Sequence, residues 1–148
     1  MLVGGGYLAK SYFAKKQTTK KEQDTFKNSA INHNKDLDAV LAKKDEKAYG
    51  EHLYKKASRF QPKIPYRIDN APEVLKRVKQ QMEAVSGSTS IISKSEELYR
   101  EGVLVVTYNY MTDSKLGDKF VEGSGKVTRV WAYIDNVWKL VHEHISEN

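Results

Sequence analysis

The chain has 148 residues, which is the size of one ordinary domain, and carries a formal net charge of +6. It contains no cysteine, which excludes disulfides, thiolate nucleophiles and zinc sites built on cysteine. The positive charge lies mainly in residues 1–27, where six lysines stand against two acidic residues. The remainder is nearly neutral and therefore a poor match for nucleic acid.

We interpret residues 1–17 as a flexible basic leader and residues 18–148 as a single domain. The apolar part of the leader, residues 2–14, is shorter than the roughly 20 residues of a membrane span and is interrupted by Lys10. It also lacks the basic start of a signal peptide. The sequence therefore favours a cytoplasmic protein. The alternative is a cell-envelope protein whose leader contacts the membrane or ends a longer anchor.

Two helices are predicted after the leader. Residues 18–33 are polar, and a capping box begins at Thr19. Residues 34–55 place apolar side chains near helical spacing, with Asn34 or Asp36 as the cap. These two segments form the first part of a helical half of the chain.

A proline-containing segment separates these helices from a third. Two prolines make residues 58–70 extended or irregular, with a short strand at 58–61. Residues 71–85 then predict a helix, because Asn70 stands at the cap position, Pro72 lies in the first turn and an apolar stripe follows at helical spacing.

The second half of the chain predicts four antiparallel strands, rich in β-branched and aromatic residues. The strands are expected at residues 89–100, 103–113, 120–134 and 137–146. A turn at 101–102 joins the first pair, and a polar loop at 114–119 joins the second strand to the third. Three helices followed by four strands indicate an α+β fold in which the helices lie on one face of a curved antiparallel sheet.

The last hairpin admits two registers, which differ in what faces Arg129. With a two-residue loop at 135–136, Arg129 shares a face with His142. With a three-residue loop at 134–136, it shares a face with Glu143. We favour the longer loop, because Asn136 can adopt the left-handed conformation that such a loop requires. Arg129, Trp131, Tyr133 and Glu143 then point to the same side of the sheet.

Three stretches carry a resemblance to a known family: "DEKAYGEHLYKKASRFQP" (45–62), "VVTYNY" (105–110) and "TRVWAYIDNVWKLVHEHIS" (128–146). They resemble the nuclear transport factor 2-like superfamily. Within it the chain is most similar to SnoaL-like proteins and to the association domain of calcium/calmodulin-dependent protein kinase II. The resemblance covers about residues 30–147. It implies a cone-shaped sheet wrapped around the three helices, with a pocket between them and a homodimer, or a higher oligomer, formed through the outer face of the sheet.

The resemblance also has implications for the pocket. The kinase association domains bind small carboxylates through three arginines. Arg129 matches one of them, whereas Asn109 and Ile145 stand where the other two would be. Enzymes of the superfamily often place an acidic base after the second helix, and here Gln61 stands at that position. A glutamine cannot accept a proton at neutral pH, so the isomerase mechanism is not supported.

We expect a ligand site with these members: Arg129, Glu143, Asn109, Tyr49, Trp131 and Tyr133. Arg129 and Glu143 are either a structural ion pair at the floor of the pocket or the anchor of an anionic or polar ligand. His142 and His144 share one face, but no third ligand accompanies them, so we expect no metal. We also expect no cofactor and assign no catalytic residue.

The sequence therefore favours a dimeric pocket domain that binds a small polar or weakly acidic molecule, assembles subunits, or does both. One alternative is an isomerase, dehydratase or hydrolase that uses Glu143 or a histidine as the base in the same pocket. Another is an accessory module tethered to the cell envelope by the leader.

Overall fold

The computed structural model describes residues 19–148. The leader predicted at residues 1–17 lies outside the described residues. Helix α2 spans Lys20–Ala42, and the Thr19 side chain caps it by accepting a hydrogen bond from the backbone N–H of Glu22 at 3.2 Å. The predicted boundary between residues 33 and 34 is wrong. No glycine or proline interrupts this stretch, so one helix of 23 residues runs through it.

The second predicted helix, residues 34–55, is divided into three parts by the structure. Its first part belongs to α2. A short helix α3 spans Glu46–His52, capped by Asp45, whose side chain accepts from the backbone N–H of Ala48. The last part begins strand β1, Leu53–Phe60, because residues from Leu53 onward pair with the C-terminal strand of the chain.

Helix α4 spans Ala71–Ala84 and confirms the third predicted helix. Asn70 caps it as expected, with its side chain accepting from the backbone N–H of Glu73 at 3.1 Å. The apolar stripe of the helix is also confirmed: Val74, Val78 and Met82 are buried. The residues before this helix contain the short strand β2, Ile68–Asp69, which pairs with β1.

The sheet has six strands in the order β2-β1-β6-β5-β4-β3. The four C-terminal strands are β3 (Gly87–Arg100), β4 (Val103–Leu116), β5 (Lys119–Ile134) and β6 (Val137–Glu147). They are antiparallel to one another, as predicted, and the α+β fold class is confirmed. The sheet as a whole is mixed, because β1 runs parallel to β6. Most of the predicted loop at 114–119 is strand, and only a two-residue turn remains, with Gly117 at a φ of +62°.

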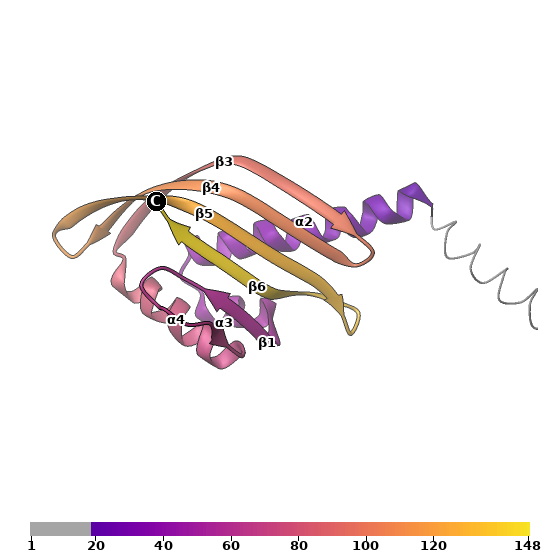
Figure 1. Cartoon of the computed structure of the whole chain (residues 1–148), viewed down its shortest axis with the longest axis horizontal. Coiled ribbons are helices and arrows are strands. Elements are labelled where there is room, and N and C mark those ends of the chain that lie inside the picture. Colours follow the sequence, from indigo (N-terminus) through magenta and orange to yellow (C-terminus); the bar gives the residue numbers. More distant parts are fainter. Residues whose placement is uncertain (1–18) are drawn as a thin grey trace, which may run out of the picture.

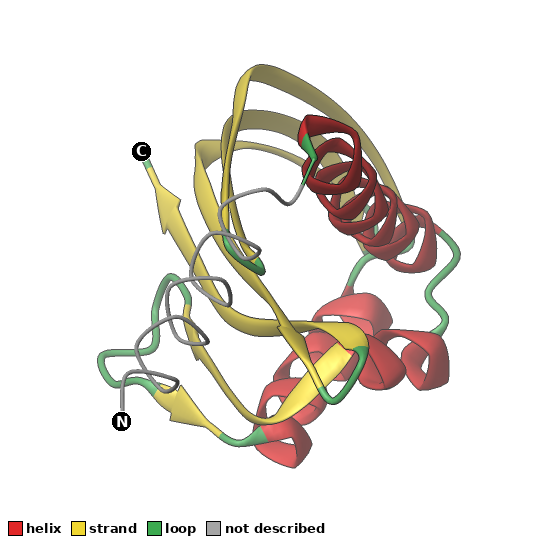
Figure 2. Cartoon of the chain, turned by 90° about the vertical axis from the view of Figure 1, so that its right-hand side faces the viewer, coloured by secondary structure: helices red, strands yellow, loops and turns green. Residues whose placement is uncertain are grey.

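The sheet curves around the helices and gives the molecule its cone shape (Figures 1 and 2). Helix α2 lies across the concave face of β3, β4 and β5, whereas α3 and α4 lie beneath β6 and β1. The core between these layers contains Leu37, Tyr49, Val74, Val78, Leu104, Val106, Trp131 and Leu140. None of the helices within residues 19–148 combines the length and apolar character needed to cross a membrane.

The β5–β6 hairpin differs from both predicted registers. Asp135 and Asn136 form a two-residue turn with φ values of +52° and +63°, so the favoured three-residue loop is wrong. A bulge then shifts the pairing between Val130 and Trp131, and beyond it Arg129 is directly opposite Glu143. The predicted common face of Arg129 and Glu143 is therefore present, but the bulge produces it rather than the loop.

Candidate functional site

A row of buried charges crosses three neighbouring strands on the concave face of the sheet. Glu143 on β6 is opposite Arg129 on β5 and beside Arg59 on β1. Its carboxylate accepts from Arg129 Nε at 2.7 Å and from Arg59 Nη1 at 2.8 Å. All three side chains are almost completely buried, so each charge needs its partner.

Helix α2 supplies the remaining contacts of Arg129. The Nη1 atom of this arginine donates to Asp38 at 2.7 Å and to Asn34 at 3.2 Å. The same oxygen of Asn34 accepts from the indole N–H of Trp131 at 3.1 Å. Asn34 is therefore a buried link between helix and sheet instead of the helix cap predicted from the sequence. Arg129 also lies over the ring of Tyr108, with 5.4 Å between its Cζ atom and the ring centroid.

The two arginines determine the protonation state of Glu143. Burial by itself would raise the pKa of this carboxyl, but the charges of Arg59 and Arg129 oppose burial, and the net effect is a lowered pKa. A carboxylate with a lowered pKa is a weak proton acceptor. Glu143 is thus suited to holding two guanidinium groups in place and poorly suited to the role of a catalytic base.

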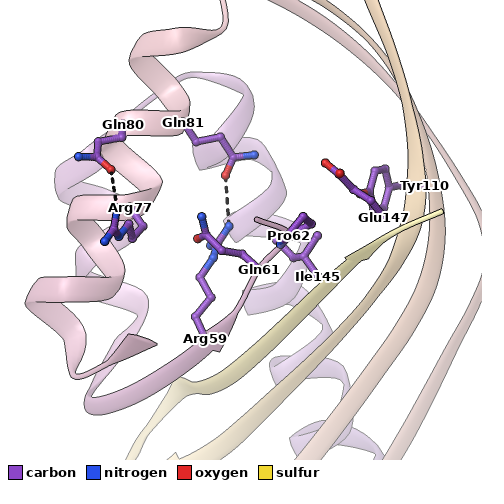
Figure 3. Close-up of a pocket in the computed structure, with 9 residues that line it drawn as sticks. All are labelled: Arg59, Gln61, Pro62, Arg77, Gln80, Gln81, Tyr110, Ile145 and Glu147. Atoms are coloured by element: carbon purple, nitrogen blue, oxygen red, sulfur yellow. Dashed lines mark hydrogen bonds between the residues drawn. The ribbon is translucent and has the colours of Figure 1, made fainter. Parts of the chain in front are cut away.

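A pocket of about 340 Å³ opens between α4, the C-terminal ends of β1 and β6, and the middle of β4 (Figure 3). Its wall consists of Arg59, Gln61, Pro62, Arg77, Gln80, Gln81, Tyr110, Ile145 and Glu147. Arg59 connects this pocket to the buried charges, because its Nη2 atom donates to Gln81 at 3.2 Å while Nη1 donates to Glu143. Arg59 is only 3% exposed.

Three residues of the pocket wall contain a buried polar atom that has no hydrogen-bond partner among the residues that the structure describes. Within residues 19–148, five buried side-chain nitrogen or oxygen atoms have no partner in the protein, and three belong to pocket residues. These three are Arg59 Nε, Gln61 Oε1 and Arg77 Nε. Buried polar groups are normally hydrogen-bonded, so these three atoms show that the polar groups behind the pocket surface are incompletely paired.

The residues predicted for the ligand site are only partly brought together. Tyr49 and Trp131 are fully buried beside the charges, where Tyr49 accepts from Arg59 Nη1 at 3.4 Å. Tyr133 lies on the same face but near the hairpin turn, and packs against Phe26 with 5.2 Å between the ring centroids. Asn109 is in register with Lys126 and belongs to the opposite face of the sheet. None of these four lines the pocket.

Sequence reasoning did not identify Arg59 and Arg77 as site residues. The signal that points to Arg59 is a charged residue in an otherwise strand-like stretch, two positions before Gln61. Arg77 lies on the side of α4 that turns toward the pocket, next to the buried stripe. Only the packing of α4 against β1 shows that the two arginines share one cavity.

The paired histidines lie on the outer face of the sheet, away from the pocket. The ring centroids of His142 and His144 are 5.6 and 5.4 Å from that of Phe60. His142 Nδ1 is also 2.8 Å from the hydroxyl of Ser58. Neither histidine reaches the pocket wall, so neither is placed to exchange a proton with a molecule bound there.

No family model and no curated protein sequence matches the chain. Several solved structures, however, superimpose on the chain. A putative dehydratase of the NTF2-like family from Streptomyces avermitilis superimposes with a TM-score of 0.75 at 16% identity, covering 85% of this chain and 98% of that one. An NTF2-like superfamily protein from Salmonella enterica gives 0.72 at 18% identity, covering 84% and 92%.

The CamKII hub homology domain of Chlamydomonas reinhardtii superimposes with a TM-score of 0.64 at 19% identity, covering 82% of this chain and 97% of that domain. The expected likeness to both NTF2-like proteins and the kinase association domain is therefore confirmed at the level of the fold. Such folds serve enzymes and binding domains alike, so the likeness does not choose between activities. The three helices, the curved mixed sheet and the pocket at the open end of the cone identify the chain as having the NTF2-like fold.

Proposed function

We propose that this chain is a non-enzymatic pocket domain that forms a homodimer and binds a small polar or weakly acidic molecule between α4, the C-terminal ends of β1 and β6, and the middle of β4. The observation that carries the proposal is a pair of arginines in the pocket wall. Arg59 is almost fully buried, and Arg77 lines the same pocket without an ion pair among residues 19–148. A guanidinium group beside a cavity is a strong donor for an acidic or polar ligand.

The composition of the wall supports binding over catalysis. Glu147 is the only carboxylate among the residues that line the pocket in the described part of the chain, and it is exposed. Glu143 is held as a carboxylate behind Arg59 with a lowered pKa. Gln61, at the position where the resemblance places an acidic base, has no proton to exchange at neutral pH.

The outer face of the sheet supports the homodimer. Cross-strand pairing places Leu98 beside Val105 and Ile91 beside Met111 on the face opposite the helices. Leu98, Ile91 and Met111 are 71%, 68% and 62% exposed, and Phe60 on β1 is also exposed on this side. The polar pairs Ser93–Asn109 and Glu96–Thr107 lie between these two apolar pairs. Exposed apolar side chains on one face of a sheet favour a protein–protein interface, and a second copy of the same face is its natural complement.

A thermal-melt screen tests ligand binding. Small carboxylates, phosphates and neutral polar molecules are added to the full chain, to Arg77→Gln and to the matched control Lys76→Gln, which removes the same charge from an exposed position on the same helix. A ligand at a hundred times its Kd stabilises the folded state by about 2.7 kcal/mol, which a melt detects readily. We expect stabilisation in the wild type and in Lys76→Gln, and its loss in Arg77→Gln. If no class of molecule stabilises the protein, only the assembly role remains.

The homodimer is tested by sedimentation equilibrium. Met111→Glu introduces a charge on the outer face, whereas Val121→Glu introduces one on the inner face of the same hairpin. We expect wild type and Val121→Glu to sediment as dimers and Met111→Glu as a monomer. A wild-type chain that remains monomeric at high micromolar concentration contradicts this part of the proposal.

A further inference from the structure

The pocket wall carries one unpaired charge of each sign. The charge of Arg59 is neutralised by Glu143. Arg77 on α4 and Glu147 on β6 also line the pocket, and neither forms an ion pair with another residue in the range 19–148. Figure 3 shows these two residues on opposite sides of the cavity. A molecule in the pocket therefore meets a cation on the helix side and an anion on the sheet side.

The two charged groups of the wall differ in their hydrogen bonding. The guanidinium of Arg77 only donates, and the carboxylate of a ligand supplies two acceptor oxygens. The carboxylate of Glu147 only accepts, and it requires an N–H or O–H donor. The ligand must therefore present both an acceptor and a donor.

Neither a simple acid nor a simple amine complements this wall. An acid pairs with Arg77 but brings a negative charge toward Glu147. An amine pairs with Glu147 but brings its positive charge toward Arg77. Like charges in one small site repel each other, so this repulsion offsets part of the favourable binding free energy of each ligand.

The size of the pocket limits the ligand to a small molecule. A volume of about 340 Å³ lies at the lower end of the range of ligand pockets, which starts at about 300 Å³. It corresponds to the space of about eleven water molecules, at about 30 Å³ each in the liquid. A short molecule with a charged group at each end fits this space, whereas a large cofactor does not.

We propose that the pocket binds a small zwitterion, a molecule that carries one carboxylate and one protonated amine. The carboxylate lies at Arg77, and the amine lies at Glu147. This inference rests on the proposed function and adds to it the second, positive group of the ligand.

Isothermal titration calorimetry on the full chain at low ionic strength tests this assignment. The probes are unbranched amino acids of two to six carbons with the amine and the carboxylate at opposite ends, each compared with the carboxylic acid and the amine of the same length. We expect at least one amino acid to bind about tenfold or more tightly than both of its matched compounds. The length of the amino acid that binds most tightly then reports the distance between the charged groups of Arg77 and Glu147.

Glu147→Gln removes the anion of the wall and keeps the shape of the side chain. In this variant we expect the amino acid to bind no more tightly than the matched acid. Glu51→Gln is the matched control. It removes the same charge, but Glu51 is exposed on α3 and does not line the pocket. This control variant retains the tenfold preference. Melting curves of both variants establish that they fold like the wild type.

Three results overturn the inference. If the matched acid binds the wild type as tightly as the amino acid, the second charge of the ligand is wrong, and the proposed function stands. If the preference for the amino acid survives in Glu147→Gln, the amine does not lie where we place it. If no amino acid binds at all, the zwitterion is excluded, and the melt screen with other polar molecules decides the proposed function separately.

Discussion

Replacing Glu143 by glutamine tests the buried row of charges without changing its shape. The carboxylate of this residue accepts hydrogen bonds at 2.7 and 2.8 Å from two arginines that are each about 3% exposed. Glutamine carries no charge, and its amide N–H groups face one of the two arginines. Arg129 keeps its ion pair with Asp38, whereas Arg59 is left buried without a counter-charge. Removal of one partner of a buried ion pair typically costs about 3–5 kcal/mol.

We therefore expect Glu143→Gln to lower the free energy of unfolding by about 3–5 kcal/mol, a large part of the roughly 5–15 kcal/mol of a typical domain. Urea denaturation at pH 7, followed by tryptophan fluorescence, measures this change. The matched control is Glu46→Gln. Glu46 pairs with Lys79 at 3.6 Å on the surface, and exposed pairs of this kind contribute about 0–1 kcal/mol.

The pH dependence provides a second readout for the same residue. Because the pKa of Glu143 is lower in the folded state than its ordinary value of about 4.5, the ionised form stabilises the fold above that pH. This contribution is lost as the pH falls from about 4.5 through the folded-state pKa. Glu143→Gln removes that part of the acid sensitivity. If Glu143→Gln lowers the free energy of unfolding at pH 7 by less than about 1 kcal/mol, or by no more than Glu46→Gln does, the reasoning is refuted.

Three further substitutions have defined outcomes. Gly125→Ala places a Cβ atom against the backbone carbonyl oxygen of Ser146, so we expect a loss of several kcal/mol in urea denaturation, whereas Gly87→Ala, with no atom within 4 Å, is nearly neutral. Asn70→Ala removes the side-chain cap of α4 and lowers stability by about 1 kcal/mol in the same assay, and an unchanged midpoint would contradict the capping role. Burial, followed by the charge of His144, lowers the pKa of His142 in the folded state, so protonation favours unfolding and stability falls as the pH drops below about 6.5. We expect His142→Asn to flatten this dependence in urea midpoints measured between pH 5 and 8.

Local signals were sufficient to predict some elements of the fold. The cap at Asn70, the proline that follows and the apolar stripe defined α4, and all three are properties of neighbouring residues. Residues 34–55 show the opposite case. The change from helix to strand at Leu53 depends on pairing with β6, more than 80 residues further along the chain. Long-range pairing overrides helical spacing, and a single sequence does not display it.

The candidate site shows the same division. The partnership of Arg129 and Glu143 followed from alternation along two adjacent strands, although the bulge near Val141 that aligns them left no pattern in the sequence. Arg59 was missed because its role depends on a parallel pairing of β1 with β6. The sequence predicts only a short strand at residues 58–61, within an irregular segment. That prediction does not say which strand is its neighbour, so it does not place Arg59 next to Glu143.

The alignment of Arg59, Glu143 and Arg129 on three adjacent strands also has a consequence for folding. Side chains alternate between the two faces of a sheet, so a slip of β1 or β5 by one residue would carry one arginine to the outer face and remove one of the two partners of the buried acid. A misaligned arrangement of that kind loses a buried ion pair. The three side chains thus favour the native register of β1, β6 and β5 as the sheet forms.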